Sequence, residues 1–331
     1  MPIIGPAPEF DPEVNVAWQP LAATQPASVT PDLIPFLRSQ RSQLSPMTDE
    51  DLRCEGFFSV EDRSVPGPDG APEISLLILR PTATTAPTGA LYWIHGGGMI
   101  LGDNRGGMGE ALIAAREFNL AVVSVEYRLA PENPHPAPAE DCYAGLVWTT
   151  GHAGELGINP ARIICAGGSA GGGLAAAVTL MARDRGGPAL LGQMLLCPML
   201  DDRNDSVSAQ QMNGTGNWDR ISNETGWEAL LGPAHGDPDV SAYAAPARAT
   251  DLSGLPPTFI DVGSAETFRD EDIAYAGAIW AAGGKAELHV WPGGIHGYAV
   301  LAPQARISQE TVATRLNWLR RLLHPATTPL P

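Results

Sequence analysis

A serine lies at the centre of a glycine-rich segment that could carry nucleophilic chemistry. Ser169 is the middle residue of Gly167–Gly171, which matches the pattern G-x-S-x-G. The preceding residues predict a strand and the following residues predict a helix. Such a strand–turn–helix connection strains the serine and exposes its oxygen, and the helix N-terminus favours developing negative charge. The segment therefore predicts a nucleophile, although the pattern alone also describes a glycine-rich turn with an incidental serine.

Two other glycine-rich segments offer the groups that a nucleophilic serine needs. His95 is followed by three glycines, 96–98. Consecutive glycines permit backbone conformations that direct N–H groups into a cavity, where they can stabilise an oxyanion. His296 lies in a glycine-rich loop after the last predicted strand, where a general base is expected. The five other histidines have no comparable setting, and we expect none of them to be catalytic.

The elements that position these groups follow from the hydrophobic pattern. Six short apolar runs predict strands at 91–94, 121–125, 162–166, 193–196, 258–262 and 287–291. Helices are predicted between and after them at 107–118, 139–150, 170–185, 268–282 and 308–323. Two earlier strands, 57–60 and 74–79, are predicted to form a hairpin. Alternation of apolar strands with helices predicts an α/β fold with a mostly parallel sheet covered on both faces.

Two segments break this alternation. Residues 1 to about 50 are rich in proline, and Pro31 and Pro35 should limit any helix there to brief pieces. Residues 203 to about 250 contain tryptophans and polar residues but no predicted strand. A segment of that length without strands is typical of a lid or a binding element. We therefore expect one domain over residues 1–331 that carries two additional segments.

The order of four motifs resembles one enzyme family. HGGG at 95–98, YRLAPENPHPAP at 127–138, GGSAGG at 167–172 and GIHGY at 294–298 occur in the order found in the hormone-sensitive-lipase-like branch of the α/β-hydrolases. The resemblance covers roughly residues 55–323. It implies an α/β-hydrolase fold with an eight-stranded sheet, a carboxylesterase activity and a Ser–His–acid triad. It also implies a two-part cap from about 1–50 and 203–250.

The resemblance assigns a role to each matching residue. Ser169 would be the nucleophile, and His296 would accept its proton and later pass it to the leaving alcohol. His95 would hold the glycine loop in place by hydrogen bonding. The oxyanion hole would consist of the backbone N–H groups of Gly97, Gly98 and Ala170.

The third member of the triad departs from the family pattern. Many relatives carry aspartate in a D-P-L-x-D-E segment, whereas this chain has GSAETFRDED at 263–272. Alignment of the shared RDE residues places Glu266 at the acid position, with Asp270 as the alternative. We expect Asp270 and Asp272 to cap the following helix and Asp261, inside a predicted strand, to be a packing or hydrogen-bonded residue.

Two further features leave the subgroup and the substrate open. Gly168 precedes the serine where better-known subgroups carry aspartate or threonine. The segment DDRN, Asp201, Asp202, Arg203 and Asn204, also occurs in some esterases of this type. It is interpreted either as a loop with helix-capping aspartates or as a segment with a direct role.

Composition and net charge limit the classes of molecule that the protein is expected to bind. The chain has 331 residues and a net charge of −17, which disfavours binding to nucleic acid and to anionic membranes. No apolar stretch is long enough to span a bilayer, and the N-terminus lacks the features of a signal peptide. The four cysteines are widely spaced, so neither a disulfide nor a zinc site is expected. We expect a cytoplasmic protein without a metal or a cofactor.

Several other functions remain as alternatives. Amidase or formamidase activity would use the same tetrahedral intermediate as ester hydrolysis. A lipase would need a larger apolar opening than the polar insertion indicates, which favours short- to medium-chain acyl esters. A small-molecule receptor on this scaffold is the non-catalytic alternative, and a nucleotide site lacks the acid expected about 20 residues after its glycines. The protein is expected to be a monomer or a homodimer.

Overall fold

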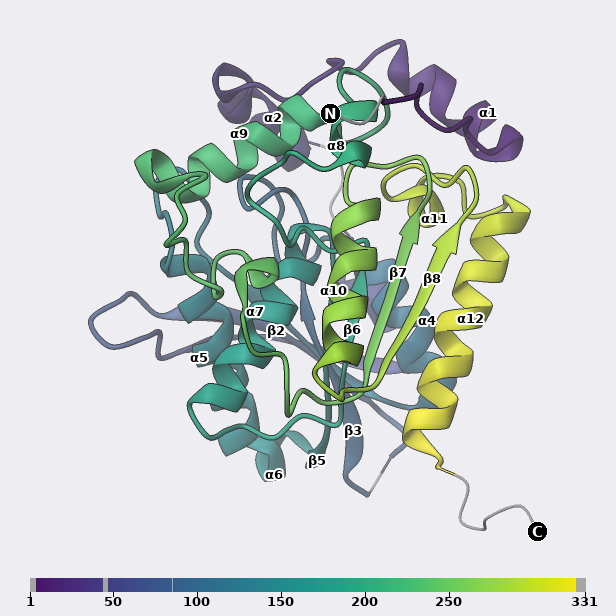
Figure 1. Ribbon diagram of the computed structural model, residues 1–331. Coiled ribbons are helices and arrows are strands. Elements are labelled where there is room, and N and C mark those ends of the chain that lie inside the picture. Colours follow the sequence, from purple (N-terminus) through teal and green to yellow (C-terminus); the bar gives the residue numbers. More distant parts are fainter. Residues whose placement is uncertain (1–3, 44–46, 85, 326–331) are drawn as a thin grey trace, which may run out of the picture.

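Eight strands form one sheet at the centre of the molecule (Figure 1). The computed structural model describes residues 4–43, 47–84 and 86–325, so parts of the predicted N-terminal segment, 1–3 and 44–46, lie outside the described residues. The strand order is β1-β2-β4-β3-β5-β6-β7-β8; β2 runs antiparallel to both neighbours and all other pairs are parallel. The predicted hairpin and the mostly parallel sheet are confirmed. The strands are β1 Phe58–Val65, β2 Ile74–Pro81, β3 Thr88–Ile94, β4 Ala121–Glu126, β5 Ile158–Gly168, β6 Gly192–Leu196, β7 Thr258–Gly263 and β8 Ala286–Trp291.

Helices cover both faces of the sheet because both faces of the strands are apolar. Along β2, Leu76 and Ile78 pack into one hydrophobic cluster, whereas Leu77 and Leu79 pack into the other. This period of two is expected of a strand buried on both sides. The first face is covered by α5 Ala137–Gly151, α7 Ala170–Asp184 and α10 Arg269–Ala281, and the second by α4 Met108–Phe118 and α12 Arg306–Leu323. The short helices α3 Asp49–Arg53, α6 Ala153–Leu156 and α11 Tyr298–Leu301 complete this part of the chain.

The N-terminal segment is more helical than its prolines suggested. It forms α1, Pro12–Ala22, and α2, Ile34–Gln43, so the prediction of brief pieces is wrong. Pro35 is the second residue of α2, where a missing N–H breaks no intrahelical hydrogen bond. Asp11 caps α1 by accepting hydrogen bonds from the N–H groups of Glu13 and Val14. Pro12 and Pro35 therefore lie at helix starts, whereas Pro20 lies inside α1.

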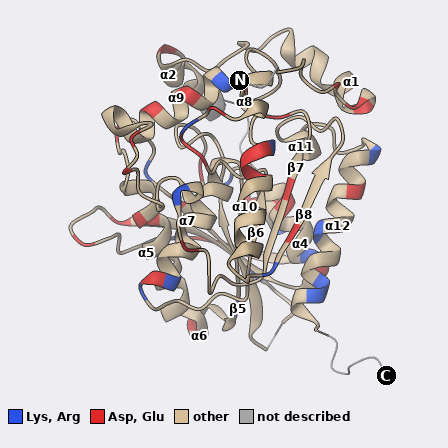
Figure 2. Cartoon of the chain, in the orientation of Figure 1, with Lys and Arg blue, Asp and Glu red and all other residues tan. Residues whose placement is uncertain are grey.

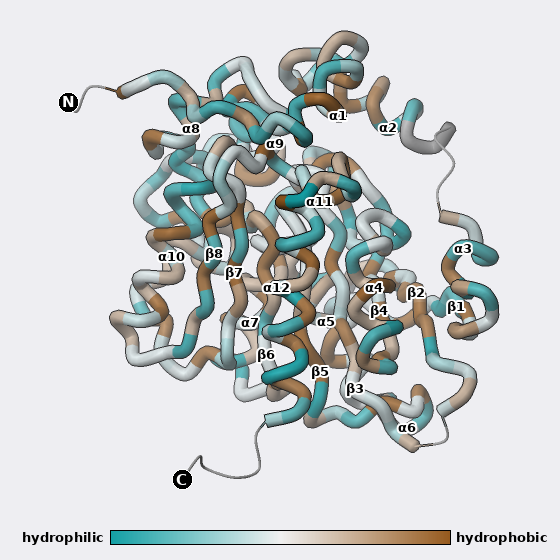
Figure 3. The backbone as a smooth tube through the Cα atoms, turned by 90° about the vertical axis from the view of Figure 1, so that its right-hand side faces the viewer, coloured by the Kyte–Doolittle hydropathy of each residue, from teal (hydrophilic) through white to brown (hydrophobic). Residues whose placement is uncertain are grey.

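Two segments distant in sequence lie together over the carboxyl ends of the strands (Figures 1 and 3). We call residues 4–43 and 203–250 the cap. The second segment contains no strand, as predicted, and forms α8 Val207–Gln211 and α9 Arg220–Leu231. Ser28 Oγ donates to Asp219 Oδ2 at 2.8 Å, and Val29 N donates to Ser222 Oγ at 2.7 Å. These bonds join the two parts of the cap directly.

The first part of the cap contacts both loops that carry the predicted site residues. Arg38 of α2 donates to the carbonyl oxygens of Ile100 and Ala130, at 2.8 and 2.6 Å. On the other side, Val14 of α1 is buried in a small cluster with Ile295, next to His296. The placement of the cap over the sheet is therefore coupled to the glycine loop and to the histidine loop.

The acidic and basic residues occur mainly in the helices and loops around the sheet (Figure 2). Asp261 on β7 is an exception; it is buried and accepts hydrogen bonds from Arg315 of α12 at 2.6 and 3.0 Å. This agrees with its predicted structural role. All four cysteines are free thiols. In the part of the chain that the structure describes, no helix has the length and apolarity needed to cross a membrane.

Candidate active site

Ser169 occupies a sharp turn between β5 and α7. Its backbone has φ 58° and ψ −127°, a region that non-glycine residues rarely adopt. The neighbouring backbones approach so closely that a Cβ at Gly167 would lie 2.4 Å from the Gly171 oxygen. A Cβ at Gly171 would lie 2.0 Å from the Ile94 oxygen. Glycine is required at both positions, and the turn has the geometry predicted for a strained, nucleophilic serine.

The structure brings His296 and Glu266 together with Ser169. The Nε2 atom of His296 lies 2.9 Å from Ser169 Oγ, and its Nδ1 atom lies 3.0 Å from Glu266 Oε1. A carboxylate can only accept, so Nδ1 carries the proton and Nε2 is left with a lone pair. That lone pair can accept the hydroxyl proton of Ser169. This geometry suits general-base activation of a serine.

Glu266 is held by its own surroundings. The side chain lies between β7 and α10 and is 1% exposed. Its second oxygen, Oε2, accepts a hydrogen bond from the Gly263 N–H at 3.1 Å. Phe268 packs edge-on against the imidazole of His296, with ring centroids 5.1 Å apart. These contacts fix the orientation of both the carboxylate and the imidazole.

The alternative acid makes other contacts. Asp270 lies in the first turn of α10, as predicted, but it accepts a hydrogen bond from the Ser208 N–H of the cap at 2.8 Å. Asp272 does not cap the helix, which corrects the prediction. It is fully buried, and among the described residues neither of its oxygens has a hydrogen-bond partner. The side chain faces inward because it lies on the covered side of α10, so it cannot reach the helix N-terminus.

Other ionisable groups near Glu266 favour their neutral forms. Burial raises the pKa of Glu271 well above its usual value, although its carboxylate also accepts from the Leu200 N–H at 2.7 Å. Burial likewise raises the pKa of Asp272 and of the Cys197 thiol, and the charge of Glu266 acts in the same direction on both. The neutral forms of these groups add no negative charge beside the imidazole.

The glycine loop after β3 lies against the serine turn. A Cβ at Gly96 would lie 3.2 Å from Ser169 Cβ, and Gly97 and Gly98 have φ of +119° and +62°. Among the described residues, the N–H groups of Gly97, Gly98 and Ala170 donate to no protein oxygen. Unused N–H groups beside a nucleophile are what an oxyanion hole requires. All three predicted donors are therefore grouped at the serine turn.

His95 forms a hydrogen bond to the backbone of this loop. It is fully buried, and its Nδ1 atom donates to the Gly96 carbonyl oxygen at 2.8 Å. The ring stacks on Tyr127 at a centroid distance of 4.1 Å, and the Tyr127 hydroxyl donates to the His95 carbonyl at 2.9 Å. The hydrogen bond predicted for His95 is present. These contacts join His95 to the glycine loop and to Tyr127.

Sequence reasoning missed the contact between Trp218 and the glycine loop. A Cβ at Gly98 would lie 2.3 Å from the Trp218 ring, and a Cβ at Gly226 of α9 would lie 2.8 Å from the Gly98 oxygen. The cap therefore packs directly on a predicted oxyanion donor. The tryptophan was visible in the insertion, but no local pattern indicates which residue it contacts more than a hundred positions away.

The segment 201–204 makes its hydrogen bonds at the start of the second part of the cap. Asp202 is buried and accepts hydrogen bonds from Arg248 at 2.7 and 3.0 Å. Asp201 pairs with Arg203 at 2.6 Å, and Asn204 donates to Glu224 of α9 at 2.8 Å. Neither aspartate caps a helix. The segment joins parts of the insertion to one another.

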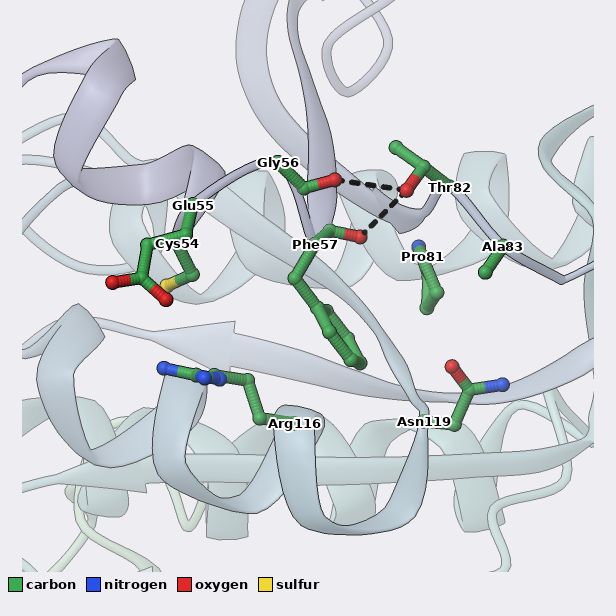
Figure 4. Close-up of a pocket in the computed structure, with 9 residues that line it drawn as sticks. All are labelled: Cys54, Glu55, Gly56, Phe57, Pro81, Thr82, Ala83, Arg116 and Asn119. Carbon is green, nitrogen blue, oxygen red and sulfur yellow. Dashed lines mark hydrogen bonds between the residues drawn. The ribbon is translucent and has the colours of Figure 1, made fainter.

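Two groups of described residues have the donor atoms and spacing to hold a metal ion. Cys197, Glu266 and His296 form one group, and Glu224, Glu228 and His235 form the other. The first overlaps the serine site, whereas the second lies in the cap. A surface pocket of about 300 Å³ lies elsewhere, between β1, the end of β2 and α4, and contains none of the predicted site residues (Figure 4). It is lined in part by Phe57, Thr82 and Arg116.

Comparison with known proteins places this geometry in a family. Residues 91–300 match a family model described as the alpha/beta hydrolase fold. The chain is 34% identical over 319 residues to carboxylesterase NlhH of Mycobacterium tuberculosis, which covers 96% of this chain and 97% of that protein. It is also 32% identical over 303 residues to esterase LipI of the same organism, covering 88% and 93% of the two chains.

Solved structures give the same result. A bacterial heroin esterase is 40% identical, with a TM-score of 0.86 over 95% of this chain and 98% of that chain. Esterase LipW of Mycobacterium marinum is 31% identical, with a TM-score of 0.85 over 97% and 99%. These similarities extend over the sheet, the serine turn and the cap. The chain therefore belongs to the hormone-sensitive-lipase-like carboxylesterase family of the α/β-hydrolases.

Proposed function

We propose that this protein hydrolyses short- to medium-chain carboxylic esters through an acyl-enzyme formed on Ser169. The observation that carries the proposal is the continuous hydrogen-bonded series from Ser169 Oγ to His296 to Glu266, at 2.9 and 3.0 Å. The names of the relatives support the same reaction class. Residues 1–331 would act as one catalytic domain with its cap.

The chemistry follows from the positions of these atoms. As Ser169 Oγ attacks the ester carbonyl carbon, His296 Nε2 accepts the hydroxyl proton. The carbonyl oxygen becomes an oxyanion, which the N–H groups of Gly97, Gly98 and Ala170 would stabilise. The imidazolium then donates its proton to the alkoxide, so the alcohol leaves and an acyl-serine remains. Water, activated by the same Nε2, releases the acid.

Glu266 would act through the histidine. Its carboxylate accepts the Nδ1 proton and so fixes the imidazole tautomer that leaves Nε2 able to accept. During the reaction the imidazole becomes cationic, and the buried carboxylate stabilises that charge. Glutamate suits this position because its loop lies beyond the end of β7 and the longer side chain spans the distance to the ring.

The cap supports the proposed restriction on substrate size. Trp218 contacts Gly98 at the predicted oxyanion hole, so a bulky ring stands beside the reacting carbonyl. The surrounding insertion is largely polar, which suits a soluble ester better than a long lipid chain. Acyl chains of increasing length would have to displace the tryptophan or pass beside it.

The activity can be tested with a series of p-nitrophenyl esters from acetyl to palmitoyl, assayed with the wild-type protein and with Ser169→Ala. The proposal predicts the highest kcat/KM at short or medium chains and loss of nearly all turnover in the variant. Matched p-nitroanilides test the amidase alternative. Preference for the anilides, or for the palmitoyl ester, would contradict the proposed substrate class.

A further inference from the structure

A second set of ionisable side chains lies in the cap, outside the serine site. Glu224 and Glu228 are separated by four residues on α9 and therefore project from the same face of the helix. His235 follows in the turn after the helix. Each residue offers one donor atom, and the three atoms all lie within 4.8 Å of one another. Two negative charges four residues apart on one helix face repel each other, so a cation bound between them would stabilise the arrangement.

The orientation of His235 fixes which nitrogen faces the glutamates. Its Nε2 atom lies 2.6 Å from the Asp202 carbonyl oxygen. A carbonyl oxygen can only accept, so Nε2 carries a proton and the neutral ring has its lone pair on Nδ1. Nδ1 lies 3.5 Å from Glu224 Oε1. A histidine that binds a metal commonly donates its other N–H to a backbone carbonyl in this way, which sets the ring orientation.

The segment 201–204 holds two of the three donors. Asp202 is buried in an ion pair with Arg248, its carbonyl accepts from His235, and its carboxylate accepts from the Gly236 N–H at 3.1 Å. Asn204, also buried, donates to Glu224 Oε2 at 2.8 Å, which leaves Oε1 facing the histidine. Among the described residues, the side-chain hydrogen bonds of this segment go to partners other than Ser169. The conformation of segment 201–204 fixes the orientation of His235 and Glu224.

We propose that Glu224, Glu228 and His235 form a binding site for a divalent transition-metal cation, with Zn²⁺ as the best match. One imidazole and two carboxylates form a donor set that zinc accepts, and water completes the tetrahedron. Zinc ligands lie at roughly 2.0–2.2 Å from the ion. His235 and Glu224 are held in place by the hydrogen bonds of segment 201–204, whereas the exposed Glu228 side chain can rotate to close the remaining distance.

The bound cation would stabilise the cap. It would neutralise the repulsion between the two glutamates and join the end of α9 to the turn that carries His235. The same helix carries Gly226, which packs on the glycine loop. The site is therefore a structural one that holds the cap helix over the serine site. It lacks the cysteine spacing and the H-E-x-x-H pattern by which zinc sites are recognised in sequences.

The test uses the full-length protein, freed of metal with a chelator, and titration calorimetry with Zn²⁺. Because Cys197, Glu266 and His296 form another donor group, binding and thermal unfolding are measured rather than esterase activity. His235→Ala and Glu228→Gln are compared with two surface controls, His152→Ala and Glu310→Gln. The proposal predicts a zinc site in the wild type and both controls, with affinity reduced at least about tenfold in the two site variants.

Thermal unfolding and Co²⁺ absorption spectra show whether the metal ion binds at the proposed site. Excess Zn²⁺ should raise the Tm of the wild type and of the controls by roughly a few degrees, and this increase should be absent in His235→Ala. Co²⁺ bound at the proposed site should show no thiolate charge-transfer band. Unchanged zinc affinity in His235→Ala, or no binding in the wild type, would overturn the proposal, and a thiolate band would report binding at the Cys197 group instead. If the wild type does not bind, a lower Tm of metal-free His235→Ala would assign the cluster to a simple His235–Glu224 ion pair.

Discussion

Two carboxylates near the end of β7 differ in what they contact, and this difference decides which one can serve the histidine. Glu266 lies in the loop before α10 and faces Nδ1 of His296. Asp270 lies one turn later, and its carboxylate accepts a hydrogen bond from the N–H of Ser208 in the cap. Alignment of the RDE residues with the family pattern is what allowed Glu266 to be predicted from sequence.

Neutralising Glu266 should therefore damage catalysis far more than neutralising Asp270. In Glu266→Gln the side-chain amide can donate to Nδ1, which favours the tautomer with the proton on Nε2. By analogy with serine proteases, kcat should fall by up to roughly 10⁴-fold. Asp270→Asn should stay within about tenfold of the wild type, because its role is a hydrogen bond to the cap worth about 1 kcal/mol.

Both variants are measured with the same short-chain ester, and circular dichroism checks their folding. A folded Glu266→Gln protein with near-normal kcat would refute the assigned acid. Loss of activity in Asp270→Asn together with near-normal activity in Glu266→Gln would show that Asp270 is the acid that orients His296.

At the scale of the elements, the glycine loop depends on Gly98. Its φ of +62° is unfavourable for other residues, and a Cβ would lie 2.3 Å from the Trp218 ring. Gly98→Ala should displace either the loop or the tryptophan. We expect a loss in kcat of roughly 10²-fold, the scale of removing one oxyanion donor. Gly109→Ala in α4 is the matched control, because a Cβ there meets nothing within 4 Å. Equal activity of the two variants would contradict this role of the loop.

The end of β4 adds a pH-sensitive contact to the segment that follows the glycine loop. Glu126 Oε2 accepts from the Asn104 N–H at 2.6 Å, and burial raises the pKa of Glu126 to about 7. Its neutral form is favoured in the folded protein. Its contribution to stability is therefore fully present below its unfolded-state pKa, near 4.5, and is lost as the pH rises toward 7. The loss amounts to at most about 3 kcal/mol.

Glu126→Gln keeps an acceptor for Asn104 but cannot ionise. Urea unfolding between pH 5 and pH 8 should show that the wild type loses stability with rising pH relative to the variant. The difference should grow between those two values and level off above the folded-state pKa. A constant difference across this range would show that Glu126 does not carry the pH dependence.

The elements of the core were predictable from sequence because their signals are local. Each buried strand is a short apolar run, and the helices between them begin and end within about two residues of the predicted positions. The helices of the cap were not predictable in the same way. α1 contains Pro20, and α9 contains Gly226 and several polar residues, so tertiary contacts rather than local preference keep them helical.

At the scale of the whole molecule, the cap and the site form one connected structure. Arg38 links α2 to the carbonyls of Ile100 and Ala130 and pairs with Glu132. These contacts join residues separated by more than sixty positions. No spacing rule reveals them, which is why Arg38 was absent from the predicted site while Ser169 and His296, marked by glycine-rich motifs, were present.

Arg38→Ala should make the glycine loop less well fixed, although Arg38 itself lies in α2 and not in the loop. The two backbone carbonyls lose a charged donor, and a small displacement of the loop should lower kcat by about tenfold or more with a smaller change in KM. Arg53→Ala is the control, since the ion pairs of Arg53 among the described residues are with nearby acids on α3 at the surface. Steady-state kinetics with a short-chain ester provide the measurement. A pure KM effect would show that Arg38 serves substrate binding alone.

The central claim is that Ser169 becomes acylated during turnover. The most direct measurement is peptide mass spectrometry after treatment with a serine-directed organophosphate, with Ser169→Ala and His296→Ala treated in parallel. The account predicts one adduct on the peptide that contains Ser169, complete loss of activity at one adduct per chain, and little or no labelling of either variant. An adduct on another serine, or full activity of the protein labelled at Ser169, would contradict it.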